Sequence, residues 1–271
     1  MQEIVRIYTN SPLRNFTYLV HESSTSQTLC IDPYDSEQVI RVLKQKGWSL
    51  QIIVNTHEHG DHTRGNEGLY KEFSPEVLTH KNAHRVVPFA TRSVSNSERI
   101  LESSDQLNYL RILDTPGHTF AHICLLQIEY EIPVAVFSGD TIFNCGVGNC
   151  KNGGDPTSLF ETVSQIFQPL SDQVLLYPGH DYLKNNLRFS FDLDPSNDST
   201  RLALENAESL SQDREFITAT FGEERTYNPF FLCFEPTAQL ISSVRRKAQN
   251  PELPSDRKSL FLSLRELRDR W

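Results

Sequence analysis

Seven consecutive residues, Thr56 to His62, constrain this chain more than any other stretch. They read Thr-His-Glu-His-Gly-Asp-His, so four side chains can bind a metal ion: His57, His59, Asp61 and His62. Imidazole and carboxylate groups are common ligands of zinc, iron and manganese. The apolar run 52–54 predicts a buried strand, which would place the ligands at the carboxyl edge of a sheet. The alternative is a histidine-rich surface loop, but four ligand-type side chains this close together favour a metal site.

The pattern of a strand followed by a ligand returns three times. Short apolar strands are expected at residues 110–113, 134–137 and 174–177. After each comes a glycine and then one ligand-type residue: His118, Asp140 and His180. Any one alone would more often be a turn residue, but three beside a four-ligand cluster favour a shared site. Seven candidates exceed the needs of one tetrahedral ion and suit two ions that share a carboxylate.

Length and composition indicate a globular protein of one large domain or two unequal ones. The 271 residues have a formal charge of −9, which argues against nucleic acid or an anionic membrane as a partner. No apolar run approaches the roughly 20 residues of a membrane span, and residues 1–6 lack the layout of a signal peptide. The five cysteines, Cys145 and Cys150 among them, are expected to be reduced thiols of a cytoplasmic protein.

The sequence changes character near residue 180. Strand signals dominate before this point, and apolar residues recur at helical spacing after it. The tail, residues 255–271, places five apolar residues on one helical stripe: Leu260, Phe261, Leu264, Leu267 and Trp271. We therefore predict a domain boundary near residue 180, with a metal-binding domain at residues 1–180 and a helical domain at residues 181–271.

The ligand motifs resemble, in their order, those of the metallo-β-lactamase superfamily. They are the segment 56–62, Pro-Gly-His-Thr at 116–119, Gly-Asp-Thr at 139–141 and Gly-His at 179–180. The stretches 177–189, 223–230 and 265–269 are similar to one family within it, hydroxyacylglutathione hydrolase (glyoxalase II). This resemblance covers nearly the whole chain. It implies an α/β fold, the αββα sandwich of the superfamily, followed by a C-terminal α-helical domain.

The resemblance also implies a role for each ligand candidate. A first ion would be held by His57, His59 and His118, and a second by Asp61, His62 and His180, with Asp140 shared between them. Asp61 and Asp140 would thereby be catalytic residues as well as ligands. Two divalent ions are expected, with zinc favoured and iron or manganese as alternatives.

The implied reaction is hydrolysis of S-D-lactoylglutathione, a 2-hydroxyacylglutathione, to glutathione and D-lactate, the second step of methylglyoxal detoxification. Four residues lie at the family's glutathione-contact positions: Lys151, Tyr182, Arg265 and Arg268. Arg265 and Arg268 are three apart and share one helical face, but they would equally suit two solvated arginines opposite the apolar stripe. The loop 146–154 departs from the family pattern, because Asn149 stands where a cation is expected. Lys151 is then expected to supply the charge from a neighbouring position.

The main alternative is a mononuclear iron dioxygenase acting on glutathione persulfide, from the same superfamily. That branch typically lacks a long helical C-terminal extension, so the tail favours the hydrolase. A non-catalytic binding module is a third interpretation, which the complete ligand set disfavours. We expect a monomer. His80, His84 and His122 fall outside the matched motifs, and the Glu58 side chain is expected to point away from the ligands.

Overall fold

The computed structural model describes residues 2–211 and 213–271, which form two compact units. The first comprises the chain up to Thr115, Phe120–Asp140 and Tyr177–Asp181. The second comprises Pro116–Thr119, Thr141–Leu176 and Tyr182–Trp271. Residues 141–176 thus cluster with the C-terminal region, and the predicted domain division at residue 180 stays a prediction.

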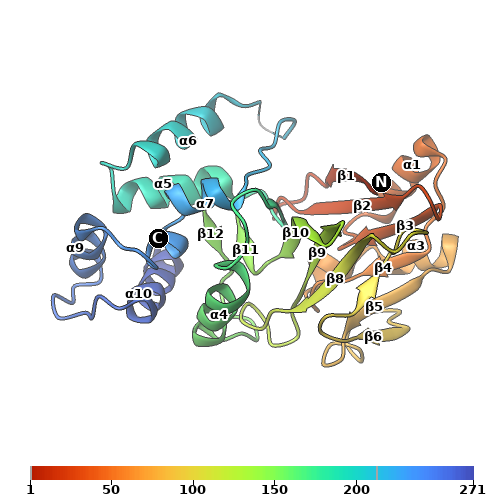
Figure 1. The fold of residues 1–271 in the computed structure, drawn as a ribbon, viewed down its shortest axis with the longest axis horizontal. Coiled ribbons are helices and arrows are strands. Elements are labelled where there is room, and N and C mark those ends of the chain that lie inside the picture. Colours follow the sequence, from red (N-terminus) through yellow and green to blue (C-terminus); the bar gives the residue numbers. More distant parts are fainter. Residues whose placement is uncertain (1, 212) are drawn as a thin grey trace. The chain divides into compact units, whose positions relative to one another are not determined.

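One sheet of the first unit has six strands in sequence order (Figure 1). They are β1 (Gln2–Tyr8), β2 (Phe16–Glu22), β3 (Gln27–Ile31), β4 (Ile52–Val54), β5 (Glu76–His80) and β6 (Arg92–Val94). The first three strands pair antiparallel, and β3 to β6 pair parallel. Parallel pairing gives β3, β4 and β5 a common carboxyl edge, and the Thr56–His62 segment leaves the sheet there.

The other sheet has the strand order β13-β10-β9-β8-β7. Its strands are β7 (Arg99–Ile100), β8 (Asn108–Asp114), β9 (Ile123–Glu129), β10 (Ile132–Gly139) and β13 (Leu175–Pro178). Tyr18 of β2 packs edge-on against Phe137 of β10, with ring centroids 5.3 Å apart, and its hydroxyl donates to the Pro178 carbonyl at 2.7 Å. The two sheets therefore face each other across a buried core, which confirms the predicted two-sheet α/β sandwich.

Helices cover the outer face of the six-stranded sheet (Figure 1). In α1 (Ser36–Lys46) the Asp35 side chain caps the first turn and Gly47, at φ 69°, ends the helix. Val39 and Leu43 of α1 pack on Leu19 of β2, whose neighbour Tyr18 points into the opposite core. This alternation follows from the two-residue period of a strand. The other helices of this unit are α2 (Gly60–Thr63) and α3 (Asn66–Phe73).

The second unit is mainly helical. A short hairpin, β11 (Ile142–Phe143) and β12 (Gly146–Val147), precedes α4 (Pro156–Thr162) and a π-helical turn at Val163–Phe167. The helices that follow are α5 (Leu183–Leu193), α6 (Asp198–Ser209), α7 (Phe221–Tyr227), α8 (Pro229–Leu232), α9 (Ala238–Lys247) and α10 (Arg257–Arg270). The predicted helical character of the C-terminal region is thus confirmed.

A buried carboxylate links the hairpin to the helices of this unit. Glu224 of α7 has no solvent exposure and accepts hydrogen bonds from the Cys145 amide at 2.9 Å and the Asn228 side chain at 2.8 Å. The Tyr227 hydroxyl contacts the same carboxylate at 3.1 Å. Because several donors surround it, this buried acid fixes the β11–β12 turn against α7.

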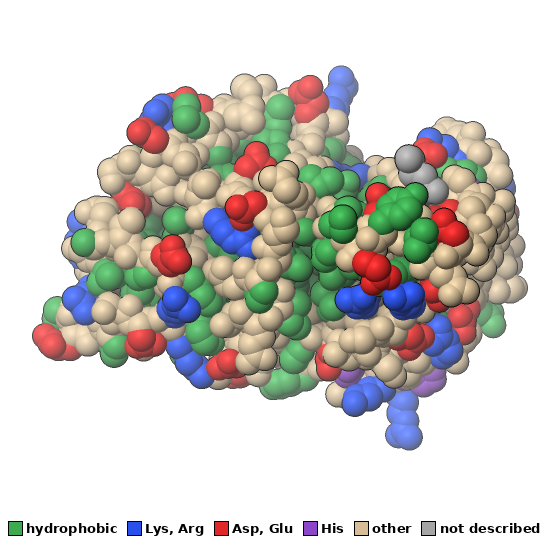
Figure 2. All heavy atoms as spheres, viewed as in Figure 1, with side chains coloured by type: hydrophobic (Ala, Val, Ile, Leu, Met, Phe, Trp, Pro, Cys, Tyr) green, Lys and Arg blue, Asp and Glu red, His purple; other side chains and the backbone are tan. Residues whose placement is uncertain are grey.

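Charged side chains of both signs are interspersed on the face of the molecule shown in Figure 2. In residues 2–211 and 213–271, no helix combines the length and apolar character that crossing a bilayer requires.

Candidate active site

The ligand-bearing segment begins where β4 ends. A buried aspartate fastens it: Asp32, at the end of β3, accepts a hydrogen bond from the Thr56 amide and another from the Thr56 hydroxyl, both at 2.7 Å. The Asn55 side chain donates to the His62 carbonyl at 2.7 Å and closes the loop around α2. The chain thus turns sharply and presents its polar side chains on one side.

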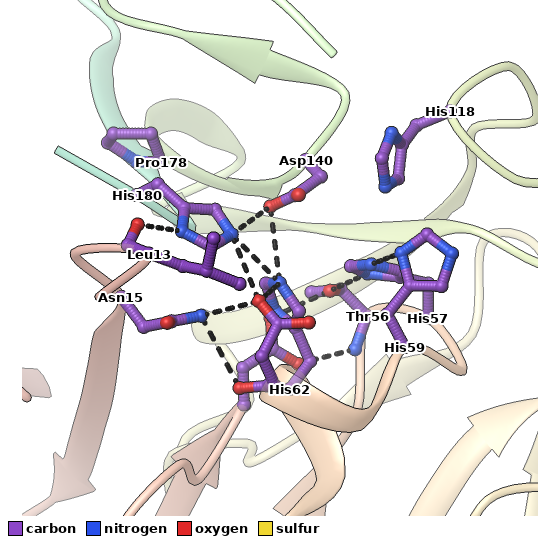
Figure 3. Close-up of polar contacts among 12 residues, drawn as sticks. Leu13, Asn15, Thr56, His57, His59, His62, His118, Asp140, Pro178 and His180 are labelled. Atoms are coloured by element: carbon purple, nitrogen blue, oxygen red, sulfur yellow. Dashed lines mark hydrogen bonds and ion pairs between the residues drawn. The ribbon is translucent and has the colours of Figure 1, made fainter. Parts of the chain in front are cut away.

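Four predicted ligands converge in the first unit (Figure 3). The Nε2 atoms of His62 and His180 lie 3.1 Å apart. An oxygen of Asp140 lies 3.3 Å from the first and 3.2 Å from the second, and an oxygen of Asp61 lies 3.4 Å from both. The two histidines and Asp140 are buried, and Asp61 is partly buried.

His57 and His59 extend this cluster. His57 is fully buried, and its Nε2 lies 3.0 Å from Nδ1 of His59. The potential ligand atoms of His57, His62 and Asp140 all lie within 4.8 Å of one another. The first unit therefore brings together six of the seven predicted ligands.

His118, the seventh predicted ligand, lies on the Pro116–Thr119 segment, which clusters with the second unit. Within that unit its Nδ1 contacts the Asn149 carbonyl at 2.6 Å. Gly154 packs so closely on this segment that a Cβ there would lie 2.1 Å from the Gly117 carbonyl oxygen. Position 154 therefore requires a glycine. The role of His118 as a metal ligand stays a prediction.

The glycines that precede Asp140 and His180 also have a steric cause. A Cβ on Gly179 would lie 2.5 Å from the Asp140 carboxylate, and one on Gly139 would lie 2.6 Å from the Thr56 hydroxyl. The Gly179 amide donates to the Gly139 carbonyl at 2.8 Å. The two backbones can approach each other and the cluster only because both residues lack a side chain.

The electrostatics of the cluster favour a cation. Burial would lower the pKa of His62, but Asp140 and Asp32 outweigh this effect and raise it well above its usual value. Burial would likewise raise the pKa of Asp61, but hydrogen bonds with His62 and Asn15 hold it below its usual range. Imidazole nitrogens and carboxylate oxygens that converge in this way are a donor set suited to divalent metal ions.

Three residues around the cluster were not predicted from the sequence. Asp32 contacts Nδ1 of His62 at 2.9 Å, and Asn15 donates to Asp61 at 2.8 Å. His122 is fully buried, its Nε2 accepts from the Asp140 amide at 3.1 Å, and its ring stacks on His57. Asp32 was detectable, because it directly follows an apolar strand as the ligands do. Asn15 and His122 had no such signal.

The four predicted carrier-binding residues lie together in the second unit. Lys151, Tyr182, Arg265 and Arg268 all line one pocket of about 370 Å³, together with Phe143 and Asn186. Lys151 is exposed, and its ammonium group lies 3.7 Å from Asp269. Arg268 donates to the Asn186 side chain at 3.1 Å and lies over the Trp271 ring. Tyr182 packs edge-on against Phe143.

Arg265 does not fit the alternative interpretation of two solvated arginines. Its side chain is 6% exposed, donates to the carbonyls of Val147 and Gly148 at 2.7 and 3.1 Å, and pairs with Asp269 at 3.0 Å. Trp271, assigned to the apolar stripe, is 48% exposed, whereas Leu264 of that stripe is fully buried. Trp271 packs edge-on against Phe189 at the end of this stripe. Helical periodicity missed the burial of Arg265 because its backbone acceptors, Val147 and Gly148, are distant in the sequence.

The chain resembles known proteins over its full length. Residues 11–214 match the metallo-beta-lactamase superfamily, and residues 181–271 match the hydroxyacylglutathione hydrolase C-terminus. The hydroxyacylglutathione hydrolase of Nitrosococcus oceani is 38% identical over 270 residues, which cover 99% of each chain. That of Polaromonas sp. is 37% identical with the same coverage.

Among solved structures, ETHE1 from Myxococcus xanthus has a TM-score of 0.64 at 22% identity and covers 98% of both chains. A metallo-beta-lactamase from Staphylococcus aureus has the same TM-score at 21% identity and covers 99% of this chain and 71% of its own. Likeness at this level of identity shows the fold alone. The full-length identity to the curated relatives, together with the matched C-terminal region, shows that this chain belongs to the hydroxyacylglutathione hydrolase family of the metallo-beta-lactamase superfamily.

Proposed function

We propose that this protein is a binuclear metal thioester hydrolase that converts S-D-lactoylglutathione to glutathione and D-lactate, the second step of methylglyoxal detoxification. The observation that carries the proposal is the cluster in which the Nε2 atoms of His62 and His180 face oxygens of Asp61 and Asp140. Such a donor set suits divalent cations, and the family membership of the chain supplies the reaction.

We assign the ligands as the family resemblance implies. His57, His59 and His118 would hold one ion, Asp61, His62 and His180 would hold the other, and Asp140 would serve both. Zinc suits the histidine-rich donor set, and iron and manganese are the alternatives. When bound, two such ions supply Lewis-acid activation of water and polarise the thioester carbonyl.

Hydrogen bonds to other residues of the chain orient the rings of His62 and His180 for metal binding. Nδ1 of His62 bonds to Asp32, and Nδ1 of His180 contacts the Leu13 carbonyl at 2.7 Å. A ring whose Nδ1 carries the proton presents the Nε2 lone pair to the cluster. Asp32 and the Leu13 carbonyl therefore fix both the tautomer and the orientation of the two rings.

The second unit would hold the thiol carrier. Glutathione has two carboxylates, and a protein with a net charge of −9 needs local cations to bind it. In the pocket of the second unit, Arg268 and Lys151 are the cations available to a ligand, and Tyr182 offers an aromatic surface. Arg265 would act mainly by shaping the pocket, because its donors already bind Val147, Gly148 and Asp269.

The test is hydrolysis of S-D-lactoylglutathione by the purified protein, with elemental analysis of the same sample. The matched control is the D-lactoyl thioester of N-acetylcysteamine, which has the same acyl group and no carboxylate on the carrier. We expect about two metal ions per chain and at least a roughly tenfold higher kcat/KM for the glutathione thioester. Equal rates with both thioesters would refute the choice of carrier. One iron per chain with oxygen consumption on glutathione persulfide would refute the hydrolase.

We further propose that the protein acts as a monomer in the cytoplasm. All five cysteines are free thiols, as in proteins of a reducing compartment. Size-exclusion chromatography with light scattering tests the oligomeric state.

A further inference from the structure

The loop between β1 and β2, which contains Leu13, reaches the metal-ligand cluster from one side (Figure 3). Three successive residues of this loop contact ligands or a neighbour of a ligand. The Leu13 carbonyl lies 2.7 Å from Nδ1 of His180, Arg14 pairs with Asp181 at 2.6 Å, and Asn15 donates to Asp61 at 2.8 Å. The two ligands contacted, Asp61 and His180, are those assigned to the same ion.

We propose that Asn15 is a positioning residue for the ion held by Asp61, His62 and His180. This inference rests on the binuclear centre of the proposed function. Asn15 would not contact the ion itself but would fix the carboxylate of Asp61 that does. Its loss should weaken the binding of one ion and leave the other unchanged.

The side chain of Asn15 is held in one orientation. The Asn15 amide donates to the Ser11 hydroxyl at 3.0 Å, and that hydroxyl lies 2.6 Å from the side-chain oxygen of Asn15. Because the hydroxyl accepts from the amide, its single proton is donated to the side-chain oxygen. The side-chain amino group must then face Asp61. Asn15 is 1% exposed, so solvent does not compete for these groups.

Both hydrogens of this amino group are directed at Asp61. Nδ2 lies 2.8 Å from the carboxylate oxygen Oδ2 and 3.4 Å from the backbone carbonyl of the same residue. Oδ2 is also the oxygen that faces Nε2 of His62 and of His180, at 3.4 Å each. Asn15 therefore binds the very atom that points into the cluster. Without this donor the carboxylate can rotate away.

Hydrogen-bond partners of metal ligands typically change metal affinity by ten- to a hundredfold. We expect a loss of about this size in Asn15→Ala, confined to one of two ions. The polar contacts that join Asn15 to His57 run through four intervening residues, Asp61, His62, Asp32 and Thr56, so the affinity of the ion assigned to His57 and His59 should stay within about twofold of wild type.

The test uses full-length protein, stripped of metal and titrated with zinc against a chromophoric chelator. Asn15→Ala and the near-isosteric Asn15→Leu are compared with wild type. Thr9→Val is the matched control, because the Thr9 hydroxyl donates to the Asn15 carbonyl in the same loop and touches no ligand. Circular dichroism of each metal-free variant reports its fold, and a titration with cobalt reports the coordination of each ion by its absorption spectrum.

The expected result is one zinc ion bound as in wild type and a second bound ten- to a hundredfold more weakly in both Asn15 variants, with Thr9→Val unchanged. Unchanged affinities, an equal loss of both ions, or an equal loss in Thr9→Val would each overturn the inference while leaving the proposed function intact. Wild-type protein that takes up fewer than two zinc ions would overturn the binuclear function and the inference together.

Discussion

Arg265 and Arg268 line the same pocket, yet separate alanine substitutions of the two should have different consequences. Arg265 is 6% exposed and donates to the backbone carbonyls of Val147, the last residue of β12, and Gly148, as well as to Asp269. Arg268 is half-buried and donates to the side-chain oxygen of Asn186. Arg265 should therefore contribute mainly to the stability of the fold, and Arg268 mainly to substrate binding.

The contacts set the size of each effect. Arg265→Ala removes the donor from two buried carbonyls, and a buried acceptor left without a partner costs about 1–3 kcal/mol. Relief of guanidinium burial offsets part of this cost, so we expect the free energy of unfolding to fall by roughly 3 kcal/mol. Arg268→Ala removes bonds to one neutral acceptor, and about 1 kcal/mol is expected. Its loss should instead raise KM about tenfold with kcat nearly unchanged.

Urea unfolding followed by circular dichroism measures the first effect, and steady-state kinetics with S-D-lactoylglutathione measures the second. Arg265→Lys is the matched control, since an ammonium keeps the charge but cannot reproduce the planar fork that reaches both carbonyls and Asp269. It should lie between wild type and Arg265→Ala in stability. The reasoning is refuted if Arg265→Ala unfolds at the wild-type urea concentration and raises KM as much as Arg268→Ala does.

Three further predictions concern the cluster and the buried acid. His59→Ala should lower bound metal and activity together, measured by elemental analysis beside the thioester assay, and full activity in the metal-depleted variant would contradict the binuclear site. Asp140→Asn should cost at least roughly ten times more kcat/KM than Glu58→Gln, because an amide cannot offer two anionic oxygens; equal, mild losses would argue against a shared carboxylate. Burial raises the pKa of Glu224 from 4.5 to about 7, despite hydrogen bonds from Asn228 and the Cys145 amide that lower it. Between pH 4.5 and about 7, Glu224 is protonated in the folded protein and ionised in the unfolded chain. Glu224 therefore makes the free energy of unfolding fall as pH rises, by roughly 3 kcal/mol over this pH range. Glu224→Gln should remove that part of the slope in urea unfolding between pH 4.5 and 7.5, and parallel profiles for the two proteins would contradict it.

The sequence was informative where function follows from position along a strand. The six ligand candidates of the first unit all lie close after strands β4, β10 and β13, and a strand end can be recognised from a short apolar run, with a glycine directly before the ligand at Asp140 and His180. Their convergence then follows from the common edge of the sheets. The same logic located the helical C-terminal region, where the period of the apolar residues changes.

The sequence was uninformative where a role depends on hydrogen bonds between distant segments. Asn15 and Asp61 are 46 residues apart, and Arg265 is 118 residues from Val147, one of its acceptors. Neither an asparagine before a strand nor an arginine in a helix has a pattern that distinguishes it from a solvated residue. Only the fold brings the donor to its acceptor, so these roles could not be predicted from periodicity or spacing.

One buried carboxylate connects two of the candidate ligands. Asp32 accepts a hydrogen bond from the Thr56 hydroxyl and faces Nδ1 of His62 with the same oxygen, Oδ2. Because the Thr56 hydroxyl uses its proton on Asp32, it can only accept from Nδ1 of His57, 3.0 Å away. Both rings are thereby left with Nε2 as the lone-pair nitrogen, the form in which imidazole binds a metal. Asp32 is 3% exposed and accepts a hydrogen bond from the Thr56 amide. Its carboxylate is therefore fixed in place when β3 and β4 pair. The tautomers of His57 and His62 are consequently set by folding of the sheet itself.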